Sequence, residues 1–477
     1  MIRSVNLPVF QDELVDGGLA VTVSNITSDV VVAIGFAASG MTSADQYINI
    51  PLLVNKGDSA DSVFGLAQHG SSLSQAIYEI SNAGATQLFA VNLGQFASAV
   101  FVDPTTQTSY PLWTDKGGGV YALNTDNYFR ALDNSYDLLA NFNADILYPA
   151  DAFALDSVTL SAGRPTNFAY QLAQKCYDMS SQNNECIGVI NMHPAASATL
   201  QGVQTYIGTP PTIVNGVVTA SGTGLLSEPY MAGATSSYPG FSVLPGFFAS
   251  NFDITDANYG LPPLSVGELL LDRKGNRVDI GKYISILAEE PTYANEAFGL
   301  ENINSYNGLG ASAYAGLVAT LVPHSAPTNK PVPGLNGLRY SKSLHQLDQL
   351  TGARYVTFRN TNRGTLVTDA PTAARSTSDY NRLQTMRIVN AVMKMIRLVA
   401  DPYIGEPNSA ASENALNSAV DKQLKKFVQQ GALRQYDFKI ITSDTDRVLG
   451  NMNINLTLVP EFEIRKINVV VVLKANI

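Results

Sequence analysis

Two patterns of hydrophobic residues alternate along the first part of the chain. Residues 30–34 are all apolar, which predicts a buried strand that Gly35 ends. Residues 73–80 carry apolar side chains at the spacing of one helix face, and Gly84 marks the end of that helix. Residues 87–93 predict the next strand. The order strand, helix, strand is typical of an α/β fold.

The alternation is interrupted twice by segments of different composition. Residues 99–134 are rich in Thr, Gly, Asp and Tyr and predict an inserted loop or hairpin. Residues 208–263 are rich in Gly, Pro, Ser and Thr and predict a small all-β insertion. Elsewhere the pattern predicts strands at 144–148 and 187–192, an apolar segment at 278–287, and helices at 167–179, 311–321 and 344–350.

The C-terminal part has the clearest periodicity. Residues 383–399 and 409–430 predict two helices, the second capped by Gly431. Residues 451–458 alternate and predict a strand with Met452, Ile454, Leu456 and Leu458 on one face. Residues 462–473 predict a last strand.

The end of that last segment needs a partner. Val469, Val470, Val471, Val472 and Leu473 are consecutive β-forming residues, and a free edge strand of this kind would aggregate. Pairing within the chain is one solution. The start of the chain, whose scattered apolar residues are simplest to interpret as an arm, offers another through strand exchange between subunits.

Charge is distributed unevenly. Lys and Arg number 30 against 40 Asp and Glu, a net charge of −10 that argues against a general nucleic-acid binder. Residues 339–477 nevertheless carry a net +7, and residues 1–338 carry −17. This basic C-terminal block predicts either a surface for an acidic partner or a solvated basic face.

The remaining composition points to a soluble protein without an export signal, because the chain has no apolar stretch long enough to span a membrane. Cys176 and Cys186 are expected to be reduced thiols, although their positions also allow a bridge.

Candidate chemistry is sparse. The loop from Gly35 to Thr42 follows a strand as a phosphate-binding loop would, but Met41 occupies the position of the lysine that contacts the phosphates. Trp113 and the 22 tyrosines fit surface packing and subunit contacts as well as a ligand platform. No enzymatic activity, metal or cofactor is therefore expected.

Ionisable residues give no catalytic pattern either. His69, His193, His324 and His345 lack the spacing of metal ligands. The adjacent carboxylates Glu289-Glu290 and Asp12-Glu13 are expected to be exposed, since neighbours in sequence rarely face one site.

A series of weak motifs occurs in a characteristic order. After the small-residue helix at 311–320 come Ala-Pro-Thr-Asn at 326–329, Leu-Asn-Gly-Leu at 335–338 and Arg-Gly-Thr at 363–365. Glu-Pro-Asn at 406–408 precedes the second C-terminal helix; Ala-Gly-Ala at 83–85, Gly-Ala-Leu at 431–433 and Pro-Glu-Phe at 460–462 complete the set. This order resembles contractile phage tail sheath proteins over about 25–100, 138–200 and 275–477.

The resemblance implies a multidomain, mixed α/β subunit. Its expected parts are an arm at 1–22, a discontinuous subtilisin-like α/β central domain at 23–100, 138–207 and 264–374, variable β-rich insertions at 101–137 and 208–263, and an inner α+β C-terminal domain at 375–477. A subtilisin-like domain raises a hydrolase interpretation, but the chain shows no catalytic Ser, His and Asp motifs of that class.

For function, the resemblance implies hexameric rings that stack helically around a tail tube and contract without nucleotide hydrolysis. Partners would be the tube, baseplate and tail terminator proteins, with no nucleic acid and no membrane insertion, in a virion tail assembled in the host cytoplasm. Alternatives are a non-contractile virion or surface-layer protein and a cryptic hydrolase; an infectious phage, a bacteriocin-like particle and a secretion machine also stay open.

The resemblance also assigns interaction residues. The inner domain of sheath proteins touches the tube, which implies tube contacts for Lys422, Lys425 and Lys426. Strand exchange between subunits would involve Val5, Leu7, Val9 and Phe10 of the arm and Val469, Val470, Val471, Val472 and Leu473 of the terminal strand.

Overall fold

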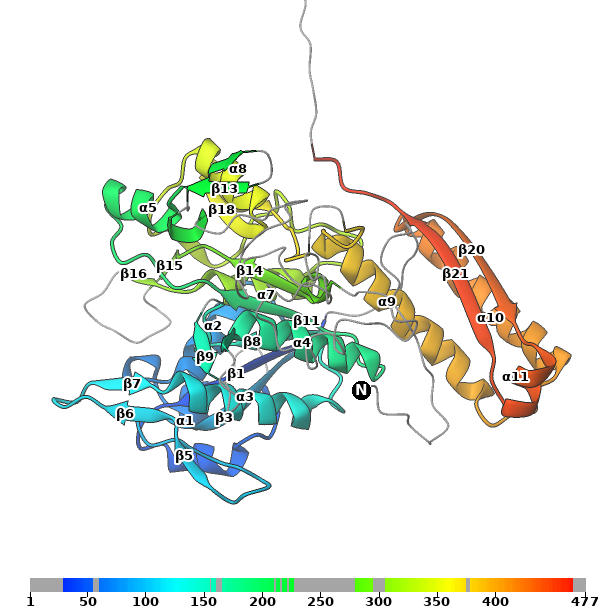
Figure 1. The fold of residues 1–477 in the computed structure, drawn as a ribbon, viewed down its shortest axis with the longest axis horizontal. Helices are drawn as coiled ribbons and strands as arrows, with labels where there is room; N and C mark the ends of the chain where they lie inside the picture. Colours follow the sequence, from blue (N-terminus) through cyan, green and yellow to red (C-terminus); the bar gives the residue numbers. More distant parts are fainter. Residues whose placement is uncertain are drawn as a thin grey trace, which may run out of the picture.

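The computed structural model describes two connected parts of the chain, a central body and a C-terminal unit that extends from it (Figure 1). The residues that it describes are 29–54, 60–154, 156–159, 165–209, 212–214, 217–220, 223–226, 279–294, 305–374 and 378–465. The predicted arm, most of the 208–263 insertion and the strand at 469–473 lie outside these residues.

An eight-stranded mixed sheet forms the centre of the body, in the order β19-β18-β14-β11-β8-β1-β3-β2. The strands from β18 to β3 in this order run parallel, and the two edge strands, β19 and β2, run antiparallel to their neighbours. Their bounds are β1 Val31–Ala37, β2 Leu52–Val54, β3 Leu88–Gln95, β8 Ile146–Pro149, β11 Ile187–Asn191, β14 Ile284–Leu287, β18 Tyr355–Thr361 and β19 Gly364–Asp369.

Helices cover both faces of this sheet because its central strands are apolar on both sides. All seven residues of β1 are buried, and the strand continues through Gly35 rather than ending there. Val31 and Ala33 pack with α2 (Ser72–Asn82) and α7 (Gly310–Thr320). Val32 and Ile34 pack on the other face with α3 (Thr125–Leu139) and α4 (Phe168–Ser181). Parallel sheets are typically covered in this way.

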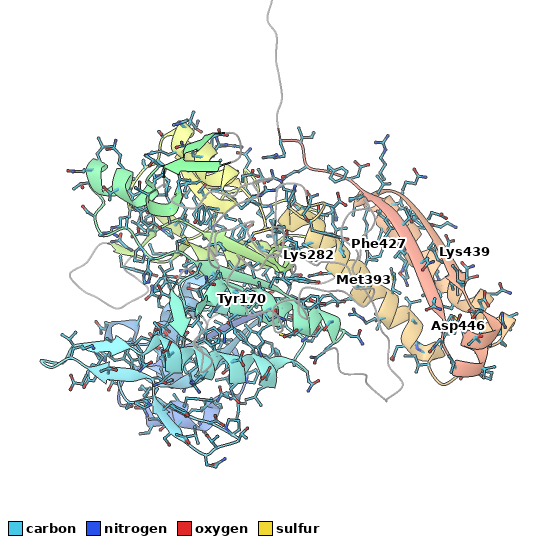
Figure 2. The ribbon with its side chains drawn as sticks, in the orientation of Figure 1. Tyr170, Lys282, Met393, Phe427, Lys439 and Asp446 are labelled. Carbon is cyan, nitrogen blue, oxygen red and sulfur yellow. The ribbon has the colours of Figure 1, made fainter. Side chains whose placement is uncertain are left out.

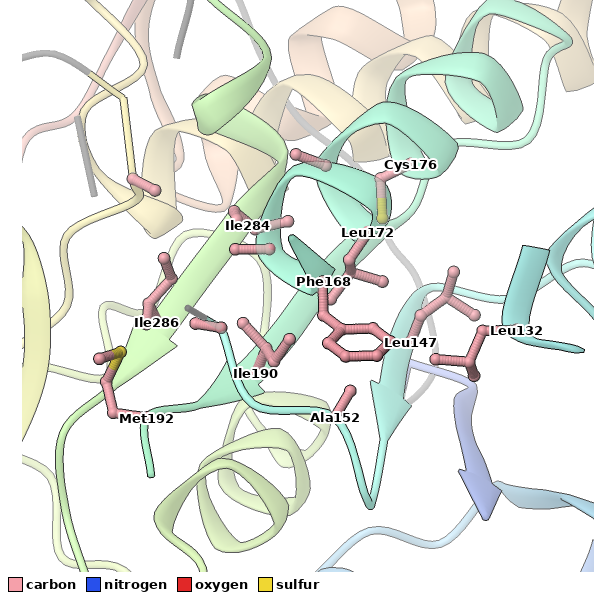
Figure 3. Close-up of a cluster of buried hydrophobic side chains, with 14 of the residues drawn as sticks. Leu132, Leu147, Ala152, Phe168, Leu172, Cys176, Ile190, Met192, Ile284 and Ile286 are labelled. Atoms are coloured by element: carbon pink, nitrogen blue, oxygen red, sulfur yellow. The ribbon is translucent and has the colours of Figure 1, made fainter. Parts of the chain in front are cut away.

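Figure 3 shows the second of these cores from within. Phe168 and Leu172 of α4 lie against Leu147, Ile190 and Ile284, which come from three adjacent strands. The body therefore has the layered α/β architecture that the sequence predicted, and the fold class is confirmed as mixed α/β with a large mixed sheet.

The segment 99–134 was only partly predicted correctly. It contains two hairpins, β4–β5 and β6–β7, but from Thr125 onward it is a helix that belongs to the core. The buried face of this helix carries Tyr128, Leu132, Tyr136 and Leu139 at helical spacing. Because the other positions of the helix are mostly polar, the composition of the segment did not indicate a helix. The hairpin strands are β4 Val100–Val102, β5 Ser109–Pro111, β6 Trp113–Asp115 and β7 Tyr121–Leu123.

Shorter elements complete the body. They are α1 Ala60–Phe64, β9 Ser157–Thr159, β10 Pro165–Asn167, α5 Leu200–Ile207, β12 Thr212–Val214, β13 Val217–Ala220, β15 Pro291–Ala294, β16 Ser305–Asn307, β17 Leu335–Leu338 and α8 Leu344–Gly352. The described 3-10 turns of the body are Thr42–Tyr47, Ala67–His69, Gly224–Leu226 and Ile280–Tyr283, and a further one, Asp401–Tyr403, follows α9 (Leu383–Ala400). The described parts of the predicted β insertion include the hairpin β12–β13 and the 3-10 turn Gly224–Leu226.

The C-terminal unit has a hydrophobic core of its own. It consists of α9 (Leu383–Ala400), α10 (Ala410–Gln429), β20 (Leu433–Ile441), α11 (Asp444–Leu449) and β21 (Asn453–Pro460). Its core includes Val392, Leu416, Val420, Leu424 and Phe427, the last of which Figure 2 labels. Both predicted helices are confirmed.

Two features of this unit differ from the prediction. β20 and α11 were not predicted, because a β-bulge at Arg434 breaks the alternation of β20 and charged residues occupy its outer face. The predicted strand 462–473 is wrong for its described part, since residues 461–465 form no strand.

In the central body, Cys176 and Cys186 are buried and free, as the default prediction had it. The domain boundaries stay a prediction.

Candidate functional site

Within the part of the chain that the structure describes, no further strand lies on either edge of the sheet of the C-terminal unit. β20 and β21 pair only with each other among the described residues. α10 packs against β20, and Phe438, Ile454 and Leu456 lie on the face that meets the C-terminal core. The opposite face is polar, with exposed Asp437, Lys439, Asn453, Asn455 and Thr457. A two-stranded sheet is marginal alone, and its free edges can accept further strands.

The chain after β21 does not return to these edges within the described residues. Arg465 pairs with Asp369 of β19 at 2.8 Å, and Glu463 lies 3.6 Å from Arg382. Ion pairs thus hold this segment against the central body, while Phe462 and Ile464 are 55% and 83% exposed. The exchange residues named above, in the arm and in the terminal strand, lie outside the described residues, so their role stays a prediction.

The three lysines of α10 are exposed, as a surface contact requires. Lys425 pairs with Asp421 at 2.5 Å, and the Tyr436 hydroxyl donates to the same carboxylate at 2.7 Å. These hydrogen bonds, that from Lys425 foremost, hold the pKa of Asp421 below its usual value. Lys422 and Lys426 make no ion pair with any described residue. Of the three lysines of α10, they are therefore the two whose charge no described acidic residue neutralises.

Much of the basic C-terminal block is neutralised inside the chain. Its arginines and lysines pair with acidic residues of the first 338 positions, which explains the uneven charge distribution without an external partner for these residues. The pairs are Arg387 with Asp29, Lys394 with Asp145, Arg397 with Glu185, Lys342 with Glu289 and Arg339 with Glu290.

The prediction that Glu289 and Glu290 are exposed is wrong. Each residue is 4% exposed, directly after β14. Glu289 contacts Lys342 at 2.7 Å and accepts a hydrogen bond from the Phe358 amide at 3.0 Å. Burial nevertheless raises the pKa of Glu289, and Lys342 opposes that rise. The sequence could not reveal this cluster, because the basic partners Arg339 and Lys342 lie about fifty positions away.

Doubly wound sheets bind ligands where the strand order reverses, which in this body is at the carboxyl ends of β1 and β8. Here Ser72 and Asp151, two half-buried side chains, form a hydrogen-bonded pair at that position. Ser72 donates to Asp151 at 2.5 Å and accepts from the Phe36 amide at 2.8 Å, and burial raises the pKa of Asp151 to about 6. Trp113 covers Phe36 with ring centroids 5.0 Å apart. The loop after β1 turns at Gly40, with φ +82°, into a short 3-10 helix.

The other candidate residues form no centre. His193 pairs with Asp156 at 2.5 Å on the surface, and its ring stacks on Phe153. Across the described ranges, His, Cys, Asp and Glu form no group of three that could hold a metal ion. Asp12 and Glu13 lie outside those ranges. The helices described there also include none long and apolar enough to cross a membrane.

One buried carboxyl was not predicted from the sequence, and no basic side chain among the described residues pairs with it. Glu79 of α2 is 1% exposed and accepts hydrogen bonds from Gln75, at 2.9 Å, and from Ser312 near the start of α7. Burial raises its pKa to about 7, and these hydrogen bonds oppose the rise. α7 has no side-chain cap from its own N-cap residue, Leu309, so the Glu79 carboxyl and the Asn191 amide oxygen supply that role.

This carboxyl should make stability depend on pH. The folded protein holds the Glu79 proton up to about pH 7, whereas the unfolded chain releases it near the ordinary glutamate pKa of 4.5. Stability should therefore be greatest below pH 4.5 and fall as pH rises through 7, by on the order of 3 kcal/mol from this group. In Glu79→Gln this contribution should disappear, so that thermal midpoints at pH 5 and pH 8 differ less than in the unaltered protein. The exposed change Asp115→Asn is the control; an equal pH response in Glu79→Gln would contradict the assignment.

Comparison with known proteins adds the fold relationship. No protein-family model and no curated protein sequence matches the chain. The chain is similar over the whole of both chains to the helical sheath of the anti-feeding prophage in the contracted state, with 13% identity and a TM-score of 0.54. It is also similar to the sheath tail protein of Desulfitobacterium hafniense, over 93% of this chain and 100% of that one, with 8% identity and a TM-score of 0.50. A third similar structure is the sheath tail protein Lin1278 of Listeria innocua. The likeness covers 92% of this chain and 93% of that one, with 10% identity and a TM-score of 0.50.

Proposed function

We propose that this chain, which has the fold of contractile tail sheath proteins, is a structural sheath subunit that polymerises around a tail tube. The likeness over the full length of the chain carries this proposal. In it, subunits form hexameric rings that stack helically, and shortening of the stack drives the tube through an envelope. Partners are the tube, baseplate and tail terminator proteins of a tail assembled in a host cytoplasm.

The open β20–β21 sheet supports a specific way of linking subunits. An arm with Val5, Leu7, Val9 and Phe10 and the strand at 469–473 could extend this sheet from a neighbouring subunit. Strand exchange would keep neighbours connected while they rotate. The work then comes from contacts that differ between an extended and a contracted lattice, without nucleotide hydrolysis.

The domain division belongs to the same proposal. The central body corresponds to the discontinuous, subtilisin-like domain of the sheath family, and the hairpins β4–β5 and β6–β7 to its outward insertions. The C-terminal unit corresponds to the inner domain, which faces the tube.

The tube contact can be tested through charge. If the tube surface is acidic, Lys422→Glu, Lys425→Glu and Lys426→Glu together should weaken assembly on tubes, most strongly at low salt, because exposed charges are screened over about 8 Å at physiological ionic strength. Cosedimentation with tubes across a salt series measures this. Lys116→Glu, Lys330→Glu and Arg363→Glu give the same change in net charge on exposed positions of the central body. Normal assembly of the α10 variant would assign the contact to another surface.

Electron microscopy of the purified chain tests the function itself. Hollow helical tubes are expected. Flat sheets or closed shells would instead favour a non-contractile virion or surface-layer protein, and persistent monomers in the presence of tubes would overturn the sheath proposal.

A further inference from the structure

One helix belongs to both parts of the molecule. α9 contributes Met386 and Val389 to a core of the central body, and Met393, labelled in Figure 2, packs against the same core. Val392 and Ile396 lie in the core of the C-terminal unit. Figure 1 shows α9 as a continuous helix that runs from the body into this unit. The joint between the two parts is therefore a helix and not a loop.

Ion pairs fix α9 to the sheet of the body. Three basic residues of the helix each pair with an acidic residue that stands just before a strand, and the three strands β1, β8 and β11 are adjacent in the sheet. We call this set the ion-pair ladder: Arg387 with Asp29 at 2.9 Å, Lys394 with Asp145, and Arg397 with Glu185.

The ladder is positioned by the helix and shielded from water. At about 100° per residue, its three basic positions fall within an arc of about 80°, away from the side that carries Val392 and Ile396. The side chains of Arg387 and Glu185 are 3% and 1% exposed. Arg387 also donates to the Leu321 carbonyl at 2.5 Å, and Arg397 donates to the Asn183 carbonyl at 3.0 Å. Such multiply bonded, shielded pairs fix geometry far better than surface pairs do.

We propose that the ion-pair ladder locks the C-terminal unit to the central body, so that the two parts move as a single rigid lever. The locking is a property of the single subunit. Its use rests on the proposed function: strands exchanged at β20–β21 would pull on the C-terminal unit, and the ladder would pass that force to the sheet of the body. A loose joint at α9 would let the unit swing while the body stayed in place.

Distances between two spin labels on the full-length monomer test the lock. Leu138 on α3 and Ser418 on α10 are exposed and can be replaced by labelled cysteines, while Cys176 and Cys186 are buried. The unaltered ladder should give one narrow distance distribution. Arg397→Glu should broaden it, and Glu185→Arg in the same chain should restore the narrow distribution by rebuilding the pair with exchanged charges.

The control is Arg447→Glu, which breaks a pair with Glu413 inside the C-terminal unit and should leave the distribution narrow. If Arg397→Glu does not fold, the distance distribution is measured instead in Arg397→Gln. It is also measured across a salt series on the labelled chain with the ladder unaltered. A narrow distribution in every folded ladder variant would overturn the proposal, as would broadening that Glu185→Arg fails to reverse. Neither result depends on polymer formation, so the sheath function is judged separately by electron microscopy.

Discussion

A chain that lacks Met1 to Leu14 should stay a folded monomer and form no polymer. The same result is expected for a chain with Val470→Pro and Val472→Pro. Proline removes the backbone N–H that a sheet ladder needs, and two such residues on alternate positions prevent pairing along one edge. In both variants the open β20–β21 sheet would lack its incoming strand, whereas the cores that the described residues form keep all of their members.

The matched control keeps the strand and changes only its polarity. Val470→Thr and Val472→Thr retain β-branched side chains and both N–H groups, so this chain should still polymerise. Electron microscopy and sedimentation report polymer, and circular dichroism reports the folded monomer. Normal sheaths from the proline variant or from the truncated chain would rule out strand exchange as the link between subunits.

Periodicity predicted most of the fold because the relevant contacts are local in sequence. α2, α4, α9 and α10 each repeat apolar residues on one face, and the predicted ranges agree with the structure to within a few positions. The buried strands β1, β3 and β11 were equally clear, since parallel strands covered on both sides are continuous apolar runs.

The failures have a common physical cause, which is that burial depends on distant partners. Glu289 and Glu290 look like solvated charges until Lys342 and Arg339 are placed beside them. α3 looks like a loop because its exposed face carries Asp and Asn, while the hairpins and α4 cover its aromatic face. The burial of Glu79 could not be predicted, because Ser312, which donates a hydrogen bond to it, lies in α7, more than two hundred positions along the chain.

Among the candidate interaction sites, too, some could be predicted from the sequence and others could not. The lysines of α10 could be identified because helix geometry alone makes them exposed. The open edges of β20–β21 could not, because β20 itself was not predicted. The basic block was predicted to be either a surface for an acidic partner or a solvated face, whereas five of its members pair with acidic residues of the first 338 positions of the same chain.

Removal of Lys342 should cause a large loss of stability. The side chains of Lys342 and Glu289 are each 1% exposed, so Lys342→Met leaves a buried carboxylate without its cation. Breaking a buried pair in this way costs about 3–5 kcal/mol, whereas exposed pairs are worth at most about 1 kcal/mol. Lys425→Met, which breaks the exposed pair with Asp421, is therefore the control and should change the thermal midpoint little.

The loss should also depend on pH and be reversible by a second change. Burial already raises the pKa of Glu289, and without Lys342 the carboxyl should hold its proton to still higher pH. Lys342→Met should then be less destabilising at pH 5 than at pH 8, because the neutral acid costs less to bury. Glu289→Gln in the same chain keeps an oxygen for the Phe358 amide and removes the charge, so it should recover most of the stability. A double variant as unstable as Lys342→Met alone would show that packing of the lysine stem, and not the unpaired charge, causes the loss.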